Sequence, residues 1–286
     1  MSLRVQLDRE SLVYRPGETV TGSVEISNLN NVQHAGLHVA LNGTLHLVPE
    51  KGAEQVSKLI HKSKQLLSPG KILGNTAIDF SLQLISENNA ELCETYHGKT
   101  VAIEYVVTAD LTRTGFAKSL RTSVDFILQN PRSTEQGEGD MEVGGTPESF
   151  VIEDIGGMKN SRIKGYLKST VIDLQKPILG ELEIESAPVI DSIELQVVRQ
   201  EKITTPEINT ETASDAQVCE IVSGNIDRLV KVPIYCLLQK FIVAPSISND
   251  KFKLAFMLRI MIKYKDDLSK SVREHYKDIS IKLLRS

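Results

Sequence analysis

The sequence predicts an all-β protein made of two tandem β-sandwich domains joined by a linker. Four segments recur in the same order at an offset of about 155 residues. Apolar and polar residues alternate along most of them, as in strands with one face on a core, and turn-forming residues separate them. An offset of this length far exceeds the 20–50 residues typical of solenoid repeats, so it indicates a duplicated domain. The domains are expected at residues 1–130 and 148–286, with the linker at 131–147.

The strands are expected in a fixed order within each copy. In sequence order, the paired segments are 22–27 with 180–186, 37–41 with 193–197, 78–82 with 233–237, and 101–107 with 254–260. Further alternating strands are predicted at 3–7 and 279–283. Turns are predicted at 15–17, 28–31, 68–70, 87–89 and 248–250, which are rich in glycine, proline, asparagine and serine.

Three segments depart from simple alternation. Residues 50–67 are a candidate helix, because Val56, Leu59, Ile60 and Leu67 recur at helical spacing. Residues 251–264 are apolar on both strand faces, which predicts cover on both sides, by the partner sheet and by either the other domain or another protein. From residue 132 to residue 154 the chain has seven acidic residues and one basic residue, with several glycines, which is typical of a linker.

Composition excludes several classes of function. The net charge is −4 and no run of basic residues appears, so nothing favours nucleic-acid binding. No apolar run approaches the ~20 residues that span a bilayer, and charged residues near the start speak against a signal peptide. A cytoplasmic protein is expected, with membrane contact only through partners. Three cysteines without a Cys-x-x-Cys pair are expected to remain reduced thiols.

Candidate catalytic and metal-binding residues are few. His34 and His38 are four residues apart, but on a strand this spacing does not bring the rings together as on a helix. Cys93 and His97 have the residue types of a nucleophile and its base, yet no protease or hydrolase signature surrounds them. No phosphate-binding loop or zinc-protease motif occurs. We therefore predict no catalytic residue, no metal site and no cofactor, with an enzyme of unrecognised site as a remaining alternative.

Four motifs, spread over both halves, carry a family resemblance. They are Glu94-Thr95-Tyr96-His97-Gly98 before the strand at 101–107, and the segments 195–201, 216–224 and 232–235. Together they resemble the small subunits of the retromer and retriever coats, arrestin-like sorting proteins, with the retriever branch the more similar. The resemblance spans nearly the whole chain and fades at 50–71, in the acidic linker and at 202–214.

The resemblance implies an arrestin-like fold and a non-enzymatic role. Such subunits dock on an α-solenoid large subunit and help return membrane cargo from endosomes to the cell surface. Sorting nexins and cargo tails would be indirect partners, and the protein would lie peripherally on endosomes. A retromer-type small subunit, or an arrestin-type cargo or signalling adaptor without a solenoid partner, remains an alternative; the Pro-Pro-x-Tyr motif common in such adaptors is absent.

The resemblance also implies a docking site in the second domain. In the retromer branch the solenoid is gripped at a Glu-Ile-hydrophobic-x-Gly turn, and the matching residues here, with the one directly after them, are Glu220, Ile221, Val222, Ser223, Gly224 and Asn225. Adjacent side chains on a strand point to opposite faces, so one of Ile221 and Val222 is expected to be exposed at the strand end. We therefore predict this turn as the partner-binding site.

Overall fold

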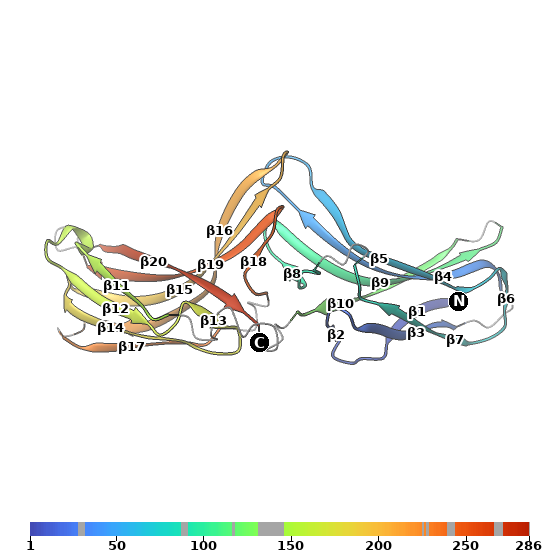
Figure 1. Cartoon of the computed structure of the whole chain (residues 1–286), viewed down its shortest axis with the longest axis horizontal. Coiled ribbons are helices and arrows are strands. Elements are labelled where there is room, and N and C mark those ends of the chain that lie inside the picture. Colours follow the sequence, from blue (N-terminus) through green and yellow to red (C-terminus); the bar gives the residue numbers. More distant parts are fainter. Residues whose placement is uncertain are drawn as a thin grey trace. The chain divides into compact units, whose positions relative to one another are not determined.

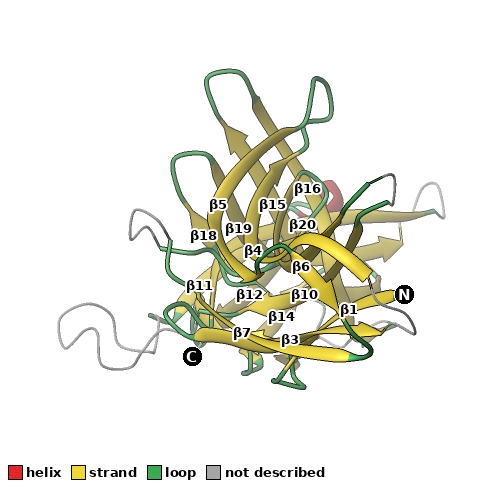
Figure 2. Cartoon of the chain, turned by 90° about the vertical axis from the view of Figure 1, so that its right-hand side faces the viewer, coloured by secondary structure: helices red, strands yellow, loops and turns green. Residues whose placement is uncertain are grey.

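The computed structural model describes residues 1–27, 32–86, 91–115, 118–130, 146–224, 226, 229–238, 244–265 and 271–285. The chain divides into two compact units, Met1–Asn130 and Pro131–Ser286, called here the N-terminal and C-terminal modules. Nearly all of the regular secondary structure in the described chain is β-strand, with the strands joined by loops and turns, as Figure 2 shows. The predicted turns at 28–31 and 87–89 and most of the predicted linker fall outside the described residues.

The N-terminal module is a sandwich of two sheets (Figure 1). The smaller sheet has the strand order β1-β3-β7; the larger has the order β2-β10-β9-β4-β5, with β6 paired to β4 and β8 to β9. The strands are β1 Ser2–Leu7, β2 Val13–Tyr14, β3 Thr19–Ser27, β4 Val32–Leu47, β5 Gln55–Leu67, β6 Gly70–Ile72, β7 Thr76–Gln83, β8 Tyr96–His97, β9 Val101–Arg113 and β10 Leu120–Leu128.

The C-terminal module repeats this architecture. One sheet has the order β11-β12-β14-β17, and the other has the order β13-β20-β19-β15-β16, with β18 paired to β19. The elements are β11 Glu148–Glu153, the 3-10 turn η1 Ile155–Gly157, β12 Arg162–Leu167, β13 Val171–Asp173, β14 Ile178–Ser186, β15 Ile190–Thr204, β16 Asn209–Ser223, β17 Lys231–Cys236, β18 Ile247–Ser248, β19 Phe252–Lys265 and β20 Val272–Leu284.

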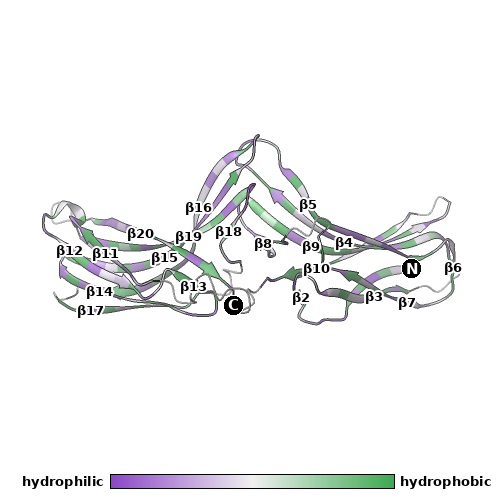
Figure 3. Cartoon of the chain, in the orientation of Figure 1, coloured by the Kyte–Doolittle hydropathy of each residue, from purple (hydrophilic) through white to green (hydrophobic). Residues whose placement is uncertain are grey.

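The strand orders confirm the duplication. The path β1-β3-β7 corresponds to β12-β14-β17, and β2-β10-β9-β4-β5 corresponds to β13-β20-β19-β15-β16. Even the unusual pairings agree, since β2 runs parallel to β10 and β13 runs parallel to β20. Apolar and polar residues alternate along most strands (Figure 3), and the apolar ones fill the core between the two sheets of each module. The all-β sandwich prediction is therefore confirmed.

The glycine that begins the first repeated segment serves the same purpose in both modules. Gly22 on β3 lies against β1, and Gly180 on β14 lies against β12. A Cβ atom built on Gly22 would lie 2.2 Å from the carbonyl oxygen of Gln6, and one on Gly180 would lie 2.2 Å from that of Tyr166. Neither site has room for a side chain, so close approach of neighbouring backbones explains why a glycine begins this segment in each copy.

The predicted helix at 50–67 is wrong. Most of this segment is the strand β5, which pairs with β4 along its whole length. Gly43 pairs with Ile60 and Thr44 with Lys58, so Leu59 is the extra residue of a β-bulge. The bulge interrupts the alternation and produced the helix-like spacing of apolar residues. Val56 is 57% exposed, so these residues do not share one buried face.

The second apolar face of the strand β19 is covered in part by its own sheet. Met261 is buried, whereas Ala255 and Met257 are half-buried. On the same face, the Arg259 guanidinium forms two hydrogen bonds with the Asp278 carboxylate, at 2.7 and 2.9 Å, and lies 4.3 Å from the ring centroid of Tyr276. The long arginine side chain thus shields apolar surface while its charge is paired. Whether another protein covers this face stays a prediction.

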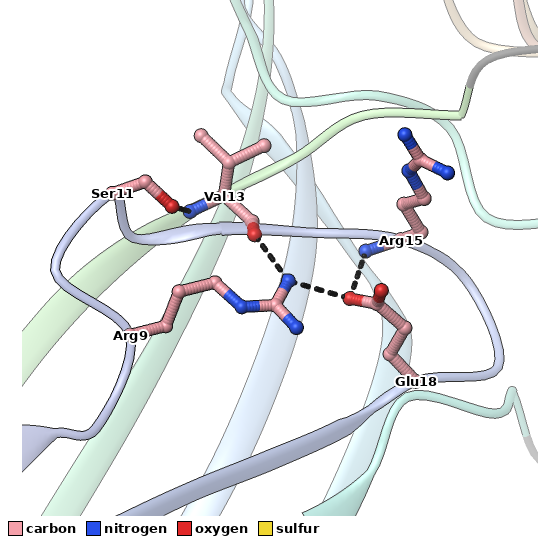
Figure 4. Close-up of polar contacts among 5 residues, drawn as sticks. All are labelled: Arg9, Ser11, Val13, Arg15 and Glu18. Carbon is pink, nitrogen blue, oxygen red and sulfur yellow. Dashed lines mark hydrogen bonds and ion pairs between the residues drawn. The ribbon is translucent and has the colours of Figure 1, made fainter.

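An ion-paired loop closes the connection from β1 to β3 (Figure 4). Arg9 Nη1 donates to the Glu18 carboxylate at 2.7 Å and to the carbonyl oxygen of Val13 at 2.5 Å. The backbone N–H of Arg15 donates to the same carboxylate oxygen at 2.9 Å. These donors, with the Arg9 side chain first, lower the pKa of Glu18. Between Arg15 and Glu18, Gly17 has a φ of 84°, as the third position of a type II turn requires.

Candidate functional site

The predicted docking residues lie at the end of the strand β16. Within the described residues, β16 pairs only with β15, so it is an edge strand of its sheet (Figure 1). Glu220, Ile221, Val222 and Ser223 are its last four residues, and Gly224 comes directly after them. Asn225 lies outside the described residues.

A β-bulge determines how the apolar pair is placed. Val222 lies opposite Ile193 and Glu220 lies opposite Glu194, so Ile221 is the extra residue on β16. Val222 is 7% exposed and belongs to the core. Ile221 is half-buried, with part of its side chain open to solvent. The pair therefore divides between core and surface as expected, although the surface member is half-buried and sits in a bulge.

Gly224 ends the strand. Its φ of 81° lies in the left-handed region, which costs a glycine little and other residues about 1 kcal/mol or more. Its backbone N–H donates to the carbonyl oxygen of Asp191 on β15 at 2.7 Å. The glycine of the motif is thus required by the turn that takes the chain away from the sheet.

The surface beside the turn carries several carboxylates. Glu220 is exposed, and its neighbour Glu194 accepts a short hydrogen bond from Lys263 Nζ. That bond, with the nearby charges of Glu194, Glu274 and Glu220, raises the pKa of Lys263. Lys265 Nζ likewise lies 3.6 Å from the Asp191 carboxylate, so two ammonium groups face four carboxylates, those of Glu194, Glu220, Glu274 and Asp191, and the rim of the site keeps an acidic character. An acidic rim favours a partner with basic side chains.

Sequence reasoning missed two further apolar residues that follow the turn in the sequence. Leu229 is 69% exposed and Val230 is 41% exposed. Leu229 has a φ of 64°, a left-handed conformation that leucine rarely adopts, and its N–H donates to the carbonyl oxygen of Ile184 at 2.7 Å. Backbone strain that presents an apolar side chain to solvent is more common at functional positions than elsewhere. The only signal in the sequence was an apolar pair placed directly before the strand β17.

The motif of residues 94–98 has a structural role. The N–H of Thr95 donates to the carbonyl oxygen of Leu128 at 3.0 Å, and the N–H of Leu128 donates to Thr95 Oγ1 at 2.8 Å. Glu94 is buried and accepts from the N–H of Asn130 at 2.9 Å. These bonds fix the last residues of the N-terminal module, where the acidic stretch begins.

The other candidate site residues have different surroundings in the structure. His34 is buried, while His38, four residues further on β4, is exposed. His97 Nε2 lies 3.5 Å from a carboxylate oxygen of Glu104, while the carbonyl oxygen of Cys93 accepts from the Tyr105 hydroxyl. Among the described residues, no group of three or more histidine, cysteine or acidic side chains could hold a metal ion. The part of the chain that was searched contains no helix long and apolar enough to cross a membrane.

Comparison with known proteins identifies the family. The family model for Vps26, vacuolar protein sorting-associated protein 26, matches residues 4–267. Vacuolar protein sorting-associated protein 26C of Dictyostelium discoideum is 26% identical over 290 residues, covering 92% of this chain and 94% of the relative. The family match covers both modules, in agreement with the arrestin-like arrangement of two sandwiches. The chain belongs to the Vps26 family of vacuolar sorting proteins.

Proposed function

We propose that this protein is the small, non-enzymatic coat subunit of a retriever-type endosomal recycling complex. It docks on an α-solenoid large subunit and helps to return membrane cargo from endosomes to the cell surface. The Vps26 family match supports a role in vacuolar and endosomal sorting, and the similarity to a 26C protein favours the retriever branch over the retromer branch. Sorting nexins and cargo tails would be reached through the complex, and membrane contact would be made through partners.

The observation that carries the docking proposal is the end of the strand β16. The half-buried Ile221 lies in a bulge, and the exposed Leu229 and Val230 come after the Gly224 turn. Interface centres are depleted of charge and rely on a few well-packed anchors, surrounded by a polar rim. Here the aliphatic side chains provide anchors, and Glu220 provides rim charge. An α-solenoid groove with apolar helix faces and basic flanking residues would complement both.

Edge strands need protection from unwanted pairing, and docking would provide it. The strand β16 presents unpaired backbone groups on its outer edge within the described residues. Its bulges, at Ile221 and near Ala216, already disfavour the regular addition of another strand. We therefore assign partner recognition to side chains at the end of the strand rather than to β-strand addition along it.

The direct test is purification of the intact protein from its own cells, with identification of the proteins that accompany it. A helical-repeat large subunit in near-equal amount is expected, and its sequence decides between the retriever and retromer branches. Recovery of receptors or coat adaptors, with no helical-repeat subunit under conditions that keep the coat assembled, would contradict docking on a solenoid. That result would favour the arrestin-type adaptor instead.

A further inference from the structure

Two edge strands of the C-terminal module meet at one side of the sandwich. The strand β16 ends the order of one sheet, and β17 ends the order of the other. A buried glutamine joins them: Gln217 Nε2 donates to the carbonyl oxygen of Leu237 at 2.8 Å and lies 3.4 Å from Cys236 Sγ. This contact holds the two sheets together at a point where neither continues.

Two cysteine thiols lie at this junction. Cys219 is two residues beyond Gln217 on β16, with regular pairing between them, so both side chains point to the same face. The thiol of Cys236 on β17 lies 3.4 Å from Gln217 Nε2, so the two cysteines lie beside the same glutamine, one on each of the two edge strands. Both are reduced in the structure. Cys219 is half-buried, whereas Cys236 is only 1% exposed.

We propose that Cys219 and Cys236 form a redox-sensitive pair, which closes to an intramolecular disulfide when the protein meets hydrogen peroxide. In the first step the Cys219 thiolate attacks a peroxide oxygen; an S–O bond forms, the O–O bond breaks, and hydroxide leaves and becomes water. In the second step the Cys236 sulfur attacks the sulfenic acid; the S–S bond forms, the S–O bond breaks, and the Cys236 proton leaves with the oxygen as water. Two thiols are oxidised, and one peroxide is reduced to two waters.

Exposure determines which sulfur reacts first. Burial, together with the neighbouring Cys219, raises the pKa of the Cys236 thiol to about 11, so it carries little thiolate at neutral pH. Cys219 reaches solvent, so it is the sulfur that peroxide attacks. Cys236 then resolves the sulfenic acid, because it lies on the neighbouring edge strand at the same junction. A sheltered resolving thiol beside an accessible one is the arrangement that favours a disulfide over further oxidation.

The position gives the bond a structural consequence. Cys219 directly precedes Glu220, so the disulfide would tie β16 to β17 at the start of the predicted docking turn. Formation of this disulfide does not depend on the docking proposal, because it requires only the two thiols. The two ideas can therefore fail separately.

The test maps the thiols of the intact, reduced protein before and after treatment with about one equivalent of hydrogen peroxide. The protein is then unfolded in urea, the remaining thiols are blocked with iodoacetamide, and the protein is digested with trypsin without reduction. Before oxidation, all three cysteines should be alkylated. After oxidation, the peptide of residues 203–228 should be linked to that of residues 232–240. Dithiothreitol should release the link, and Cys93 should remain alkylated.

Matched variants sharpen the outcome. Cys219→Ser, at the half-buried position, should abolish the linked peptide, while Cys93→Ser should leave its yield unchanged. Sulfinic or sulfonic acid at Cys219 without a linked peptide in the wild-type protein would overturn the pair. A link from either thiol to Cys93 would also overturn it. Because the wild-type protein decides the question, a failure of Cys236→Ser to fold would not affect the result.

Discussion

The two modules share a scaffold but differ in the path that the chain takes after the long edge strand. In both, a bulge interrupts that strand at the same place: Leu66 is the extra residue on β5, and Ile221 is the extra residue on β16. After the bulge of the N-terminal module, the chain continues in the same direction as β6 and pairs again with β4. After the bulge of the C-terminal module, it turns at Gly224 and leaves the β15 side.

The charges near the two bulges differ as well. Lys64 and Lys71 lie near the N-terminal bulge, whereas Glu220 and Asp191, the latter paired with Lys265, lie near the C-terminal one. A partner suited to an acidic rim would therefore be disfavoured at the equivalent place in the other module. The bulge is an inherited feature of the duplicated fold. The turn and the charges around it are the features that distinguish the proposed docking surface from its counterpart in the N-terminal module.

The largest effect should come from the glycines that the modules share. Gly22→Ala and Gly180→Ala should each destabilise the module concerned by roughly 2–3 kcal/mol, because the new Cβ would be 2.2 Å from a backbone oxygen. Urea-induced unfolding monitored by circular dichroism measures the loss, with the exposed Thr19→Ala on β3 as a control. A large loss at one glycine and none at the other would show that the modules do not pack equivalently.

The next prediction concerns the boundary between the modules. Limited proteolysis should cut first within residues 129–146, where acidic and glycine residues dominate and few apolar side chains are available to order the chain. Two fragments close to residues 1–130 and 148–286 should then resist further cleavage. Resistance of this stretch, with early cleavage inside the strand β9, would place the boundary elsewhere.

The sequence predicted the features that depend on local pattern and on repetition. The alternation of Ile78, Phe80 and Leu82 is the alternation of the strand β7, and the repeated glycines marked the same backbone contact twice. Most of the fold can be derived from such patterns, because one face of each strand must meet a core.

Two features could not be obtained in this way. The strand β5 was mistaken for a helix, since an edge strand buries little and its bulge at Leu59 disturbs the period of two. The exposure of Leu229 depends on a left-handed backbone that leucine does not favour, and no pattern of residue types encodes it. At the proposed docking turn, the residue types predicted a strand end, whereas the bulge at Ile221 depends on pairing with β15.

The smallest effect should appear in acid, at the ion-paired loop of the N-terminal module. Hydrogen bonds from Arg9 and Arg15 lower the pKa of Glu18 from its usual 4.5, so the ionised carboxylate stabilises the fold at neutral pH. That stability is present above about pH 4.5 and is lost as the pH falls through the lower folded-state pKa. Glu18→Gln should cost under about 1 kcal/mol at pH 7, since the pair is partly exposed.

Melting curves of wild type and Glu18→Gln from pH 7 down to pH 3 measure this difference. The difference in melting temperature between the two proteins should become smaller as the pH falls below about 4.5. A difference in melting temperature that stays constant from pH 7 to pH 3 would show that the charge of Glu18 does not contribute to the stability of the fold.

The most direct measurement compares the two bulges in one binding assay. The assay measures the affinity of each variant for the purified solenoid subunit. At the C-terminal bulge, the variants are Ile221→Asp and the double variant Ile221→Asp with Val222→Asn. At the N-terminal bulge, the matched variants are Leu66→Asp and the double variant Leu66→Asp with Leu67→Asn. Circular dichroism and melting curves accompany each variant, because Val222 belongs to the core. Loss of an apolar anchor at an interface centre costs ~2 kcal/mol, or roughly 30-fold in Kd. We expect that loss for folded Ile221→Asp and little change for Leu66→Asp; full affinity of folded Ile221→Asp, or equal losses at both bulges, would contradict docking through the C-terminal turn.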